Sequence, residues 1–318
     1  MGIESLLVEL PSWIGDGVMA TGAVKELVER ISPRQLYLMG RPPLLELVLP
    51  LFPTAVPIEY RREGRWKRLL FHPKIAEIGV SFRSSLYSRL FLKKVTTRYW
   101  NFSDPSTLHM VEKYSRFVEG ILNQLNFSPS PPPYPPLLKT TPYYYPRPTI
   151  GINPGATYGG AKRWYPDRFA EVANRLGKWF DVVIFGGPGE EEIAGEIEKG
   201  LKIPNYHNWA GKLTLSQLAS RIGGLSLFIT NDSGPMHIAS ALGVPVVAIF
   251  GPTDWRETSP WGKNSQIVRV PLPCSPCKKR ECPLGTHECM RLVTPEMVVE
   301  AARRLVGDFS KINQKGER

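Results

Sequence analysis

The chain has 318 residues, 42% of them hydrophobic, which is enough for two domains of common size with a core each. No run approaches the roughly 18 to 20 apolar residues of a membrane span, and the N-terminus lacks a secretion-signal pattern, so we expect a cytoplasmic protein. The net charge of +11 indicates an acidic partner: nucleic acid, an anionic membrane or a phosphorylated substrate.

The first half of the chain predicts alternating strands and helices. Residues 5–10 form an apolar strand, and a glycine-bearing loop containing Asp16 leads to a helix from about 18 to 30. Strands over 35–39 and 74–80 and helices over 43–49, 84–93 and 106–125 complete one layered α/β domain.

Asp16 follows the first predicted strand directly. Ligands bind at this edge of an open parallel sheet, so a carboxylate there is a candidate functional group. The alternative is that Asp16 only caps the following helix.

Residues 61–98 form a basic segment with interleaved aromatic side chains, and its first part holds Arg61, Arg62, Arg65, Lys67 and Arg68. Nucleic-acid binding fits this charge, but no RNA- or DNA-binding motif accompanies it. A merely solvated basic face is the other interpretation.

Residues 128–148 are rich in proline, which lacks a backbone donor and favours extended geometry. This stretch predicts a semi-rigid connector between an N-terminal domain, 1–147, and a C-terminal domain, 148–318.

The second half opens with a strand over 149–153 and a glycine-rich loop that contains Lys162. Such a loop suggests phosphate binding, although the Gly-Lys-Ser/Thr spacing of a P-loop is missing. Helices over 166–176 and 214–222, a strand over 182–185, a helix beginning with three glutamates and a C-terminal helix over 294–306 follow.

Residues 225–258 predict a strand, a turn, a helix over 236–242 and a second strand. Small and capping residues at Ser233 and Gly234 leave backbone N–H groups of the helix start pointing at one spot, which attracts phosphate. An ordinary strand-to-helix turn is the alternative for this local pattern.

The string Asn231-Asp232-Ser233-Gly234-Pro235-Met236-His237, followed by Gly251-Pro252-Thr253-Asp254, resembles the nucleotide-sugar site of the bacterial lipopolysaccharide heptosyltransferases of glycosyltransferase family nine. The segments 11–16, 153–156, 161–164 and 274–289 extend the resemblance, which is greatest to the heptosyltransferase II type. It implies an α/β GT-B fold: two Rossmann-like α/β/α domains facing across a central cleft, the acceptor held by the first and the nucleotide-sugar by the second.

The resemblance implies an inverting glycosyltransferase that moves L-glycero-D-manno-heptose from ADP-heptose to the inner core of lipopolysaccharide. The acceptor is either lipid A-Kdo or heptosyl-Kdo-lipid A, and the enzyme lies peripherally at the cytoplasmic face of the inner membrane. Arg61, Arg62, Arg65, Lys67 and Arg68 then contact the acceptor or the anionic membrane, and no nucleic acid is expected.

The resemblance also assigns site residues. Asp16 is the catalytic carboxylate that deprotonates the acceptor hydroxyl, and Lys162 stabilises the departing diphosphate. The donor site comprises Thr157, Lys162, Glu191, Asp232, Ser233, Gly234 and His237. No cofactor or metal is expected, since no Asp-x-Asp metal motif accompanies the site.

Some of these assignments have structural alternatives. His237 also fits a satisfied histidine within a helix, and the three glutamates at 190–192 also fit a helix N-terminus, which acidic residues stabilise.

All four cysteines, Cys274, Cys277, Cys282 and Cys289, lie in one short segment with His287. Their spacing is not the paired Cys-x-x-Cys of common zinc sites, so a zinc site, reduced thiols and disulfides all stay open. We interpret the segment as a structural loop.

Two other functions fit parts of the sequence. A related GT-B enzyme, using another nucleotide-sugar or acting as an epimerase, fits the same fold class. A non-catalytic membrane or nucleic-acid binder fits the charge.

Overall fold

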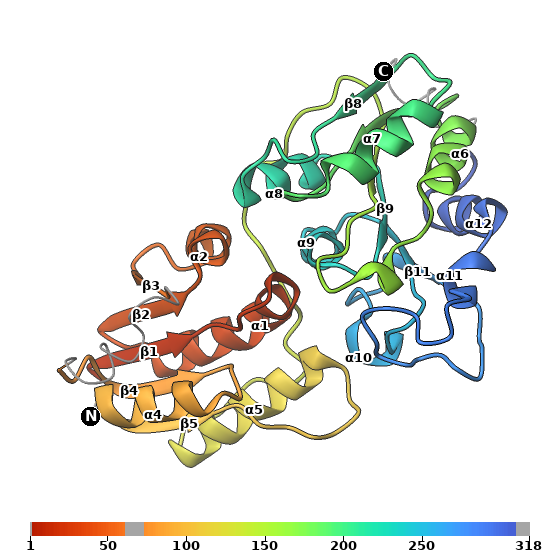
Figure 1. Cartoon of the computed structure of the whole chain (residues 1–318). Coiled ribbons are helices and arrows are strands. Elements are labelled where there is room, and N and C mark those ends of the chain that lie inside the picture. Colours follow the sequence, from red (N-terminus) through yellow and green to blue (C-terminus); the bar gives the residue numbers. More distant parts are fainter. Residues whose placement is uncertain (1, 61–72, 310–318) are drawn as a thin grey trace. The chain divides into compact units, whose positions relative to one another are not determined.

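The computed structural model describes residues 2–60 and 73–309. The chain divides into two compact units, Met1–Lys139 and Thr140–Arg318. Each unit is built on a parallel sheet covered by helices (Figure 1).

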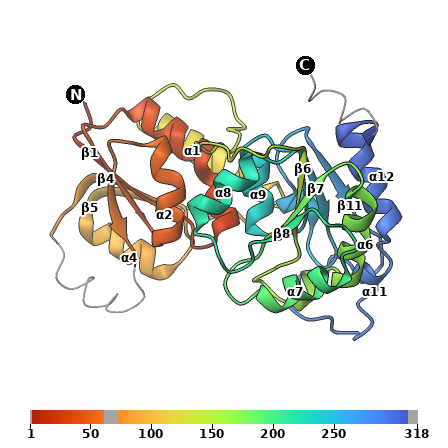
Figure 2. The same cartoon turned by 90° about the horizontal axis from the view of Figure 1, so that it is seen from above.

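In the first unit, apolar strands form a sheet in the order β3-β2-β1-β4-β5. Leu6, Leu7 and Val8 of the central strand are fully buried, as expected for a parallel strand covered on both faces. Helices α1 and α5 pack together on one face and α4 covers the other (Figure 2). The elements are β1 (Ser5–Glu9), α1 (Ile14–Ile31), β2 (Gln35–Gly40), α2 (Pro42–Val48), η1 (Leu49–Leu51), β3 (Val56–Glu59), β4 (Ala76–Ser81), α4 (Leu86–Val95), β5 (Thr96–Asn101) and α5 (Met110–Gln124).

In the second unit, the parallel sheet has the order β11-β10-β9-β6-β7-β8. Helices α6, α7 and α12 lie on one face, and α8 and α9 lie on the other (Figures 1 and 2). The elements are β6 (Thr149–Asn153), η2 (Gly160–Lys162), α6 (Pro166–Leu176), β7 (Asp181–Ile184), α7 (Glu191–Gly200), β8 (Tyr206–Asn208), α8 (Leu215–Gly223), β9 (Leu227–Asn231), α9 (Gly234–Ala241), β10 (Val246–Ile249), α10 (Trp255–Thr258), β11 (Ser265–Val268), α11 (Glu288–Arg291) and α12 (Pro295–Val306).

Both sheets follow the order of a Rossmann fold. In each sheet, the first strand in the sequence lies in the middle, and the next two strands are added on one side of it. The chain then returns to the middle, and the remaining strands are added on the other side. The reversal falls between β1 and β4 in the first unit and between β6 and β9 in the second. Loops diverge at such a pair and leave a crevice at the carboxyl ends of the strands, where ligands bind.

The predicted elements agree with the structure apart from their ends and a few short pieces. Helix α1 begins at Ile14, so Asp16 lies in its first turn and not in a preceding loop. Its N-cap is Trp13, so Asp16 does not occupy the capping position. The sequence patterns predict no strand at β3, β5, β8 or β11, and no helix at α10 or α11.

The proline-rich segment contains the boundary between the units, and it packs against the first unit before that boundary and against the second unit after it. Tyr134 is buried, and its N–H donates to Ser115 of α5 at 2.8 Å. The Leu137 N–H donates to Thr21 of α1 at 2.9 Å. Farther along, the Tyr143 N–H donates to the Ser220 carbonyl of the second unit at 2.8 Å.

Gly22→Ala should destabilise the protein, because an added Cβ would lie 2.2 Å from the Pro135 carbonyl oxygen. Overpacking of this kind costs about 1–3 kcal/mol, measurable as a loss in the free energy of urea-induced unfolding. Gly120→Ala in α5 is the control, since nothing lies within 4 Å of its added Cβ. Ala should raise stability there by about 0.5–1 kcal/mol. Equal effects of the two substitutions would contradict the close packing of the segment on α1.

Candidate active site

An ion pair joins the two loops at the reversal point of the second sheet. Lys162, after β6, places its Nζ 2.6 Å from Oδ2 of Asp232, after β9. The side chains are only 13% and 6% exposed. The Thr253 hydroxyl, after β10, donates to the same carboxylate oxygen at 2.6 Å. Loops following three neighbouring strands therefore converge on one carboxylate.

Asn231, the last residue of β9, fixes both ends of the loop that carries Lys162. Its side-chain oxygen accepts from the Trp164 N–H at 3.1 Å, and its side-chain nitrogen donates to the Pro154 carbonyl at 2.7 Å. Trp164 is fully buried, and its indole N–H donates to the Val293 carbonyl at 3.1 Å. The position of Lys162 thus follows from contacts to the sheet and to the core.

Helix α9 starts beside this ion pair in the sequence, and its N-cap is Ser233. The Ser233 side chain makes no capping bond; its Oγ lies 3.2 Å from the Thr230 hydroxyl and 3.4 Å from the Asn153 amide nitrogen. The first-turn N–H groups, beginning at Gly234, are therefore not capped by Ser233 and form a positive helix end suited to phosphate. His237 is buried on the same helix.

The other two predicted donor residues lie near the surface. Thr157 is exposed in the turn after β6. Glu191 is exposed at the start of α7 and accepts from the Gly189 N–H at 2.8 Å. Glu190 instead reaches the loop after β6: a Cβ added at Gly155 would lie 2.0 Å from its carboxylate. The structure thus places Glu190, rather than Glu191, against that loop.

The cysteine segment braces the Lys162 loop from outside. The Nε2–H of His287 donates to the Ala161 carbonyl at 2.9 Å, while its Nδ1 lies 3.1 Å from the Tyr165 hydroxyl. This tautomer is assigned from the partners, since a carbonyl can only accept. The Ala161 N–H donates to the Arg280 carbonyl at 3.0 Å. These contacts fit the predicted structural loop.

All four thiols are free and line one cavity of about 20 Å³. Burial raises the pKa of Cys289 to about 11, whereas backbone N–H groups, that of His287 first, lower the pKa of Cys282. Within residues 2–60 and 73–309, no three His, Cys, Asp or Glu side chains are placed to hold a metal ion together.

In the first unit, Asp16 lies half-buried in the first turn of α1, just beyond the carboxyl end of β1. A negative charge in the first turn of a helix interacts favourably with the positive end of the helix. Burial first, and then the charge of Asp16, raise the pKa of the buried Tyr114 on α5.

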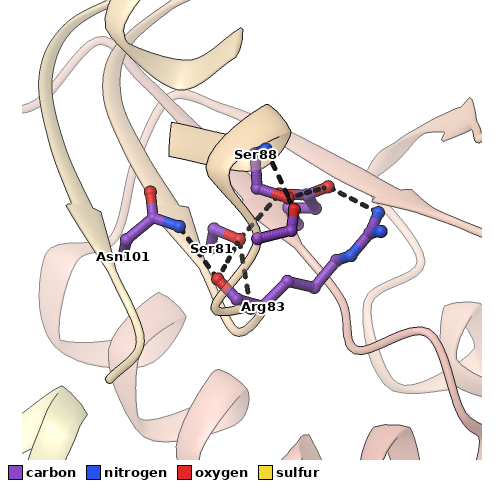
Figure 3. Close-up of polar contacts among 6 residues, drawn as sticks. Ser81, Arg83, Ser88 and Asn101 are labelled. Atoms are coloured by element: carbon purple, nitrogen blue, oxygen red, sulfur yellow. Dashed lines mark hydrogen bonds and ion pairs between the residues drawn. The ribbon is translucent and has the colours of Figure 1, made fainter. Parts of the chain in front are cut away.

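A second charged cluster, which the sequence patterns did not indicate, occupies the reversal point of the first sheet (Figure 3). Glu9, the last residue of β1, is 1% exposed and accepts from Arg83 Nη1 at 2.9 Å. Two hydroxyls also donate to Glu9: Ser81, which ends β4, at 2.6 Å and Ser88 of α4 at 3.0 Å. Asn101, which ends β5, donates to the Arg83 carbonyl at 2.8 Å.

The predicted acceptor and membrane contacts Arg61, Arg62, Arg65, Lys67 and Arg68 lie outside the described residues. Among the helices of the described part of the chain, none combines the length and the apolar character needed to cross a membrane.

Comparison with known proteins shows which protein family the chain belongs to. Residues 88–287, well over half of the chain, match glycosyltransferase family 9 (heptosyltransferase). The chain belongs to this heptosyltransferase family. The resemblance expected from the sequence is therefore confirmed, and the protein is a glycosyltransferase. Its family membership sets aside both an epimerase and a non-catalytic binder.

Individual relatives match the heptosyltransferase over nearly its whole length. Lipooligosaccharide heptosyltransferase 2 of Campylobacter jejuni is 36% identical over 318 residues, covering 95% of this chain and 98% of the relative. The structure of E. coli ADP-heptose lipopolysaccharide heptosyltransferase II has a TM-score of 0.75 at 27% identity, covering 95% and 98% of the two chains.

An E. coli heptosyltransferase solved with ADP-2-deoxy-2-fluoro heptose has a TM-score of 0.70 at 15% identity, covering 94% and 99% of the chains, and it shows the fold alone. The GT-B fold class expected from the sequence is confirmed by these matches.

Glu9 should give the stability of this heptosyltransferase a measurable pH dependence. Burial raises its pKa, outweighing Arg83 and the serine hydroxyls, which lower it. The folded state then binds the proton more tightly than the unfolded chain. The resulting stabilisation is full below the ordinary glutamate pKa of about 4.3 and is lost as pH rises through the raised value.

Relative to Glu9→Gln, the wild-type free energy of unfolding should therefore fall with rising pH in urea titrations. Glu29→Gln, which removes an exposed carboxylate from α1, should show no such difference. A wild-type advantage over Glu9→Gln that grows with pH would contradict a raised pKa at Glu9.

Proposed function

We propose that the protein transfers L-glycero-D-manno-heptose from ADP-heptose to the inner core of lipopolysaccharide with inversion at the anomeric carbon. The observation that carries this proposal is the Lys162–Asp232 pair beside the uncapped start of α9, at the reversal point of the second sheet. Family membership supplies the reaction class, and the similar C. jejuni and E. coli proteins are named as heptosyltransferases 2 and II.

The donor diphosphate binds the second unit in this proposal. As the glycosidic bond breaks, negative charge develops on the departing ADP, and Lys162 and the N–H groups from Gly234 onward stabilise it. Asp232, which also accepts from the Thr253 hydroxyl, holds the ammonium group in place beforehand, so little reorganisation is needed. Thr157, Glu191, Ser233 and His237 complete the proposed donor site.

The acceptor binds the first unit, where Asp16 acts as general base. Its carboxylate takes the proton of the acceptor hydroxyl as that oxygen attacks the anomeric carbon from the face opposite ADP. Direct displacement of this kind inverts the configuration. The acceptor is Kdo or a previous heptose on lipid A, and its lipid places the enzyme at the cytoplasmic face of the inner membrane. Arg61, Arg62, Arg65, Lys67 and Arg68 are the proposed contacts to that surface.

Lys162→Ala should weaken ADP binding by roughly 10- to 100-fold, since it removes a charged donor and leaves Asp232 to repel the diphosphate. Calorimetric titration without added metal measures this change, with UDP as the competing nucleotide. Lys199→Ala, an exposed charge loss in α7, is the control and should bind ADP normally. Preference for UDP in the wild type would point to another donor, and equal losses in the two variants would remove Lys162 from the donor site.

Asp16→Asn should lower kcat by at least about 100-fold, because the amide cannot accept the acceptor proton. Its ADP affinity and unfolding temperature should stay close to wild type. Asp167→Asn is the matched control, as Asp167 also lies in the first turn of a helix, α6. Transfer of heptose to a lipid A acceptor is the assay, and near-normal turnover of Asp16→Asn would rule out its role as the base.

A further inference from the structure

The proposed reaction leaves the charged cluster of the first sheet without a role. Glu9 ends β1, and Arg83 follows β4. These strands are neighbours at the reversal point, the place where open α/β sheets bind ligands. Asp16 comes from the same edge, since α1 follows β1 directly. A pair of opposite charges therefore occupies the ligand-binding edge of the unit that binds the acceptor in the proposed reaction.

Stability alone is a poor explanation of this pair. A carboxylate that is only 1% exposed has lost its hydration, and a buried ion pair commonly stabilises no more than apolar side chains of the same volume. Glu9 nonetheless accepts hydrogen bonds from three side chains: Arg83, Ser81 and Ser88. Together these contacts hold the guanidinium group of Arg83 in one orientation.

Arg83 is held on two sides, and part of its guanidinium has no partner among the described residues. Its Nη1 bonds to Glu9 at 2.9 Å, and its guanidinium carbon lies 4.5 Å from the centre of the Tyr60 ring. Among residues 2–60 and 73–309, its Nε and Nη2 groups have no hydrogen-bond partner. The side chain is 17% exposed, so solvent reaches part of it. A preoriented guanidinium with donors that no described residue uses is suited to a carboxylate or phosphate.

We propose that Arg83, oriented by Glu9, is an acceptor-positioning residue that binds an anionic group of the acceptor and so places the attacking hydroxyl at the reaction centre. This inference rests on the proposed function. The anion is a sugar carboxylate or a phosphate, which offer the same paired oxygens to a guanidinium. Glu9 does not touch the acceptor; it fixes the orientation of the planar Arg83 guanidinium and its paired N–H donors.

The test is steady-state heptose transfer to whichever of lipid A-Kdo and heptosyl-Kdo-lipid A the wild type uses. Arg83→Gln should raise the acceptor KM by about tenfold or more, the loss expected for a charged hydrogen bond, with kcat and the ADP-heptose KM little changed. Arg83→Lys keeps the charge but not the fork and should recover part of the affinity. Glu9→Gln/Arg83→Gln removes both charges, so it leaves no unpaired buried carboxylate and should repeat the KM effect in a folded protein.

Arg34→Gln is the matched control, because Arg34 forms an exposed pair with Glu4 just before β1, at the opposite end of the same sheet. Repeating the assay with dephosphorylated acceptor identifies the anion. If the effect of Arg83→Gln disappears, the phosphate is bound; if it persists, the carboxylate is bound.

An acceptor KM in Arg83→Gln and the double variant equal to that of Arg34→Gln, or a loss confined to kcat, would overturn the inference while leaving the proposed function intact. Absence of transfer by the wild type would instead overturn the proposed function, and this inference with it.

Discussion

Each sheet reverses its direction of growth at one pair of adjacent parallel strands, and this constraint determines where the buried ion pairs of both units lie. β1 pairs with β2 and β4, and β6 pairs with β7 and β9, so the connections leave these strands toward opposite faces. Loops that diverge from neighbouring strand ends cannot pack on each other, which leaves space for polar side chains. Glu9 and Ser81 end the reversing strands of the first sheet, and Asn153 and Asn231 those of the second.

At both reversal points, a buried carboxylate is paired with a cation and with hydroxyl groups. Asp232 receives Lys162 and a hydroxyl, and Glu9 receives Arg83 and two hydroxyls. In both cases the carboxylate is almost completely buried and the cation keeps more exposure, 13% for Lys162 and 17% for Arg83. Such an arrangement holds a cation in a fixed orientation at the carboxyl ends of the strands. An unpaired surface cation would have to be ordered by each ligand that binds.

How much of this can be predicted from the sequence depends on whether the signal is local. The strands β1 and β6 are short apolar runs followed by turn residues, so both can be predicted from the local sequence. The strand β3 contains Pro57 and is largely exposed, and β8 has three polar or aromatic residues, so only pairing with a neighbouring strand makes them strands.

The same distinction applies to the site. The family motifs indicate Lys162 and Asp232 separately, but the bond between them depends on the adjacency of β6 and β9. No motif marks Glu9, and Arg83 is one cation within a basic segment. Their pairing follows only once β1 and β4 are neighbours. Which glutamate of the run 190–192 lies against the loop after β6 is likewise visible only in space, where Glu190 is the one beside Gly155.

The cysteine segment contacts the loop that carries Lys162 through its backbone and His287. Three of its residues bond to the short stretch that precedes Lys162: the Lys278 carbonyl to the Tyr158 hydroxyl, the Arg280 carbonyl to the Ala161 N–H, and His287 to the Ala161 carbonyl. Asn231 fixes the same loop from the sheet side. Two unrelated parts of the chain therefore determine where the ammonium group lies. Electrostatic stabilisation of a leaving group is strongest when its donors need not move, so this double support is what the proposed role of Lys162 requires.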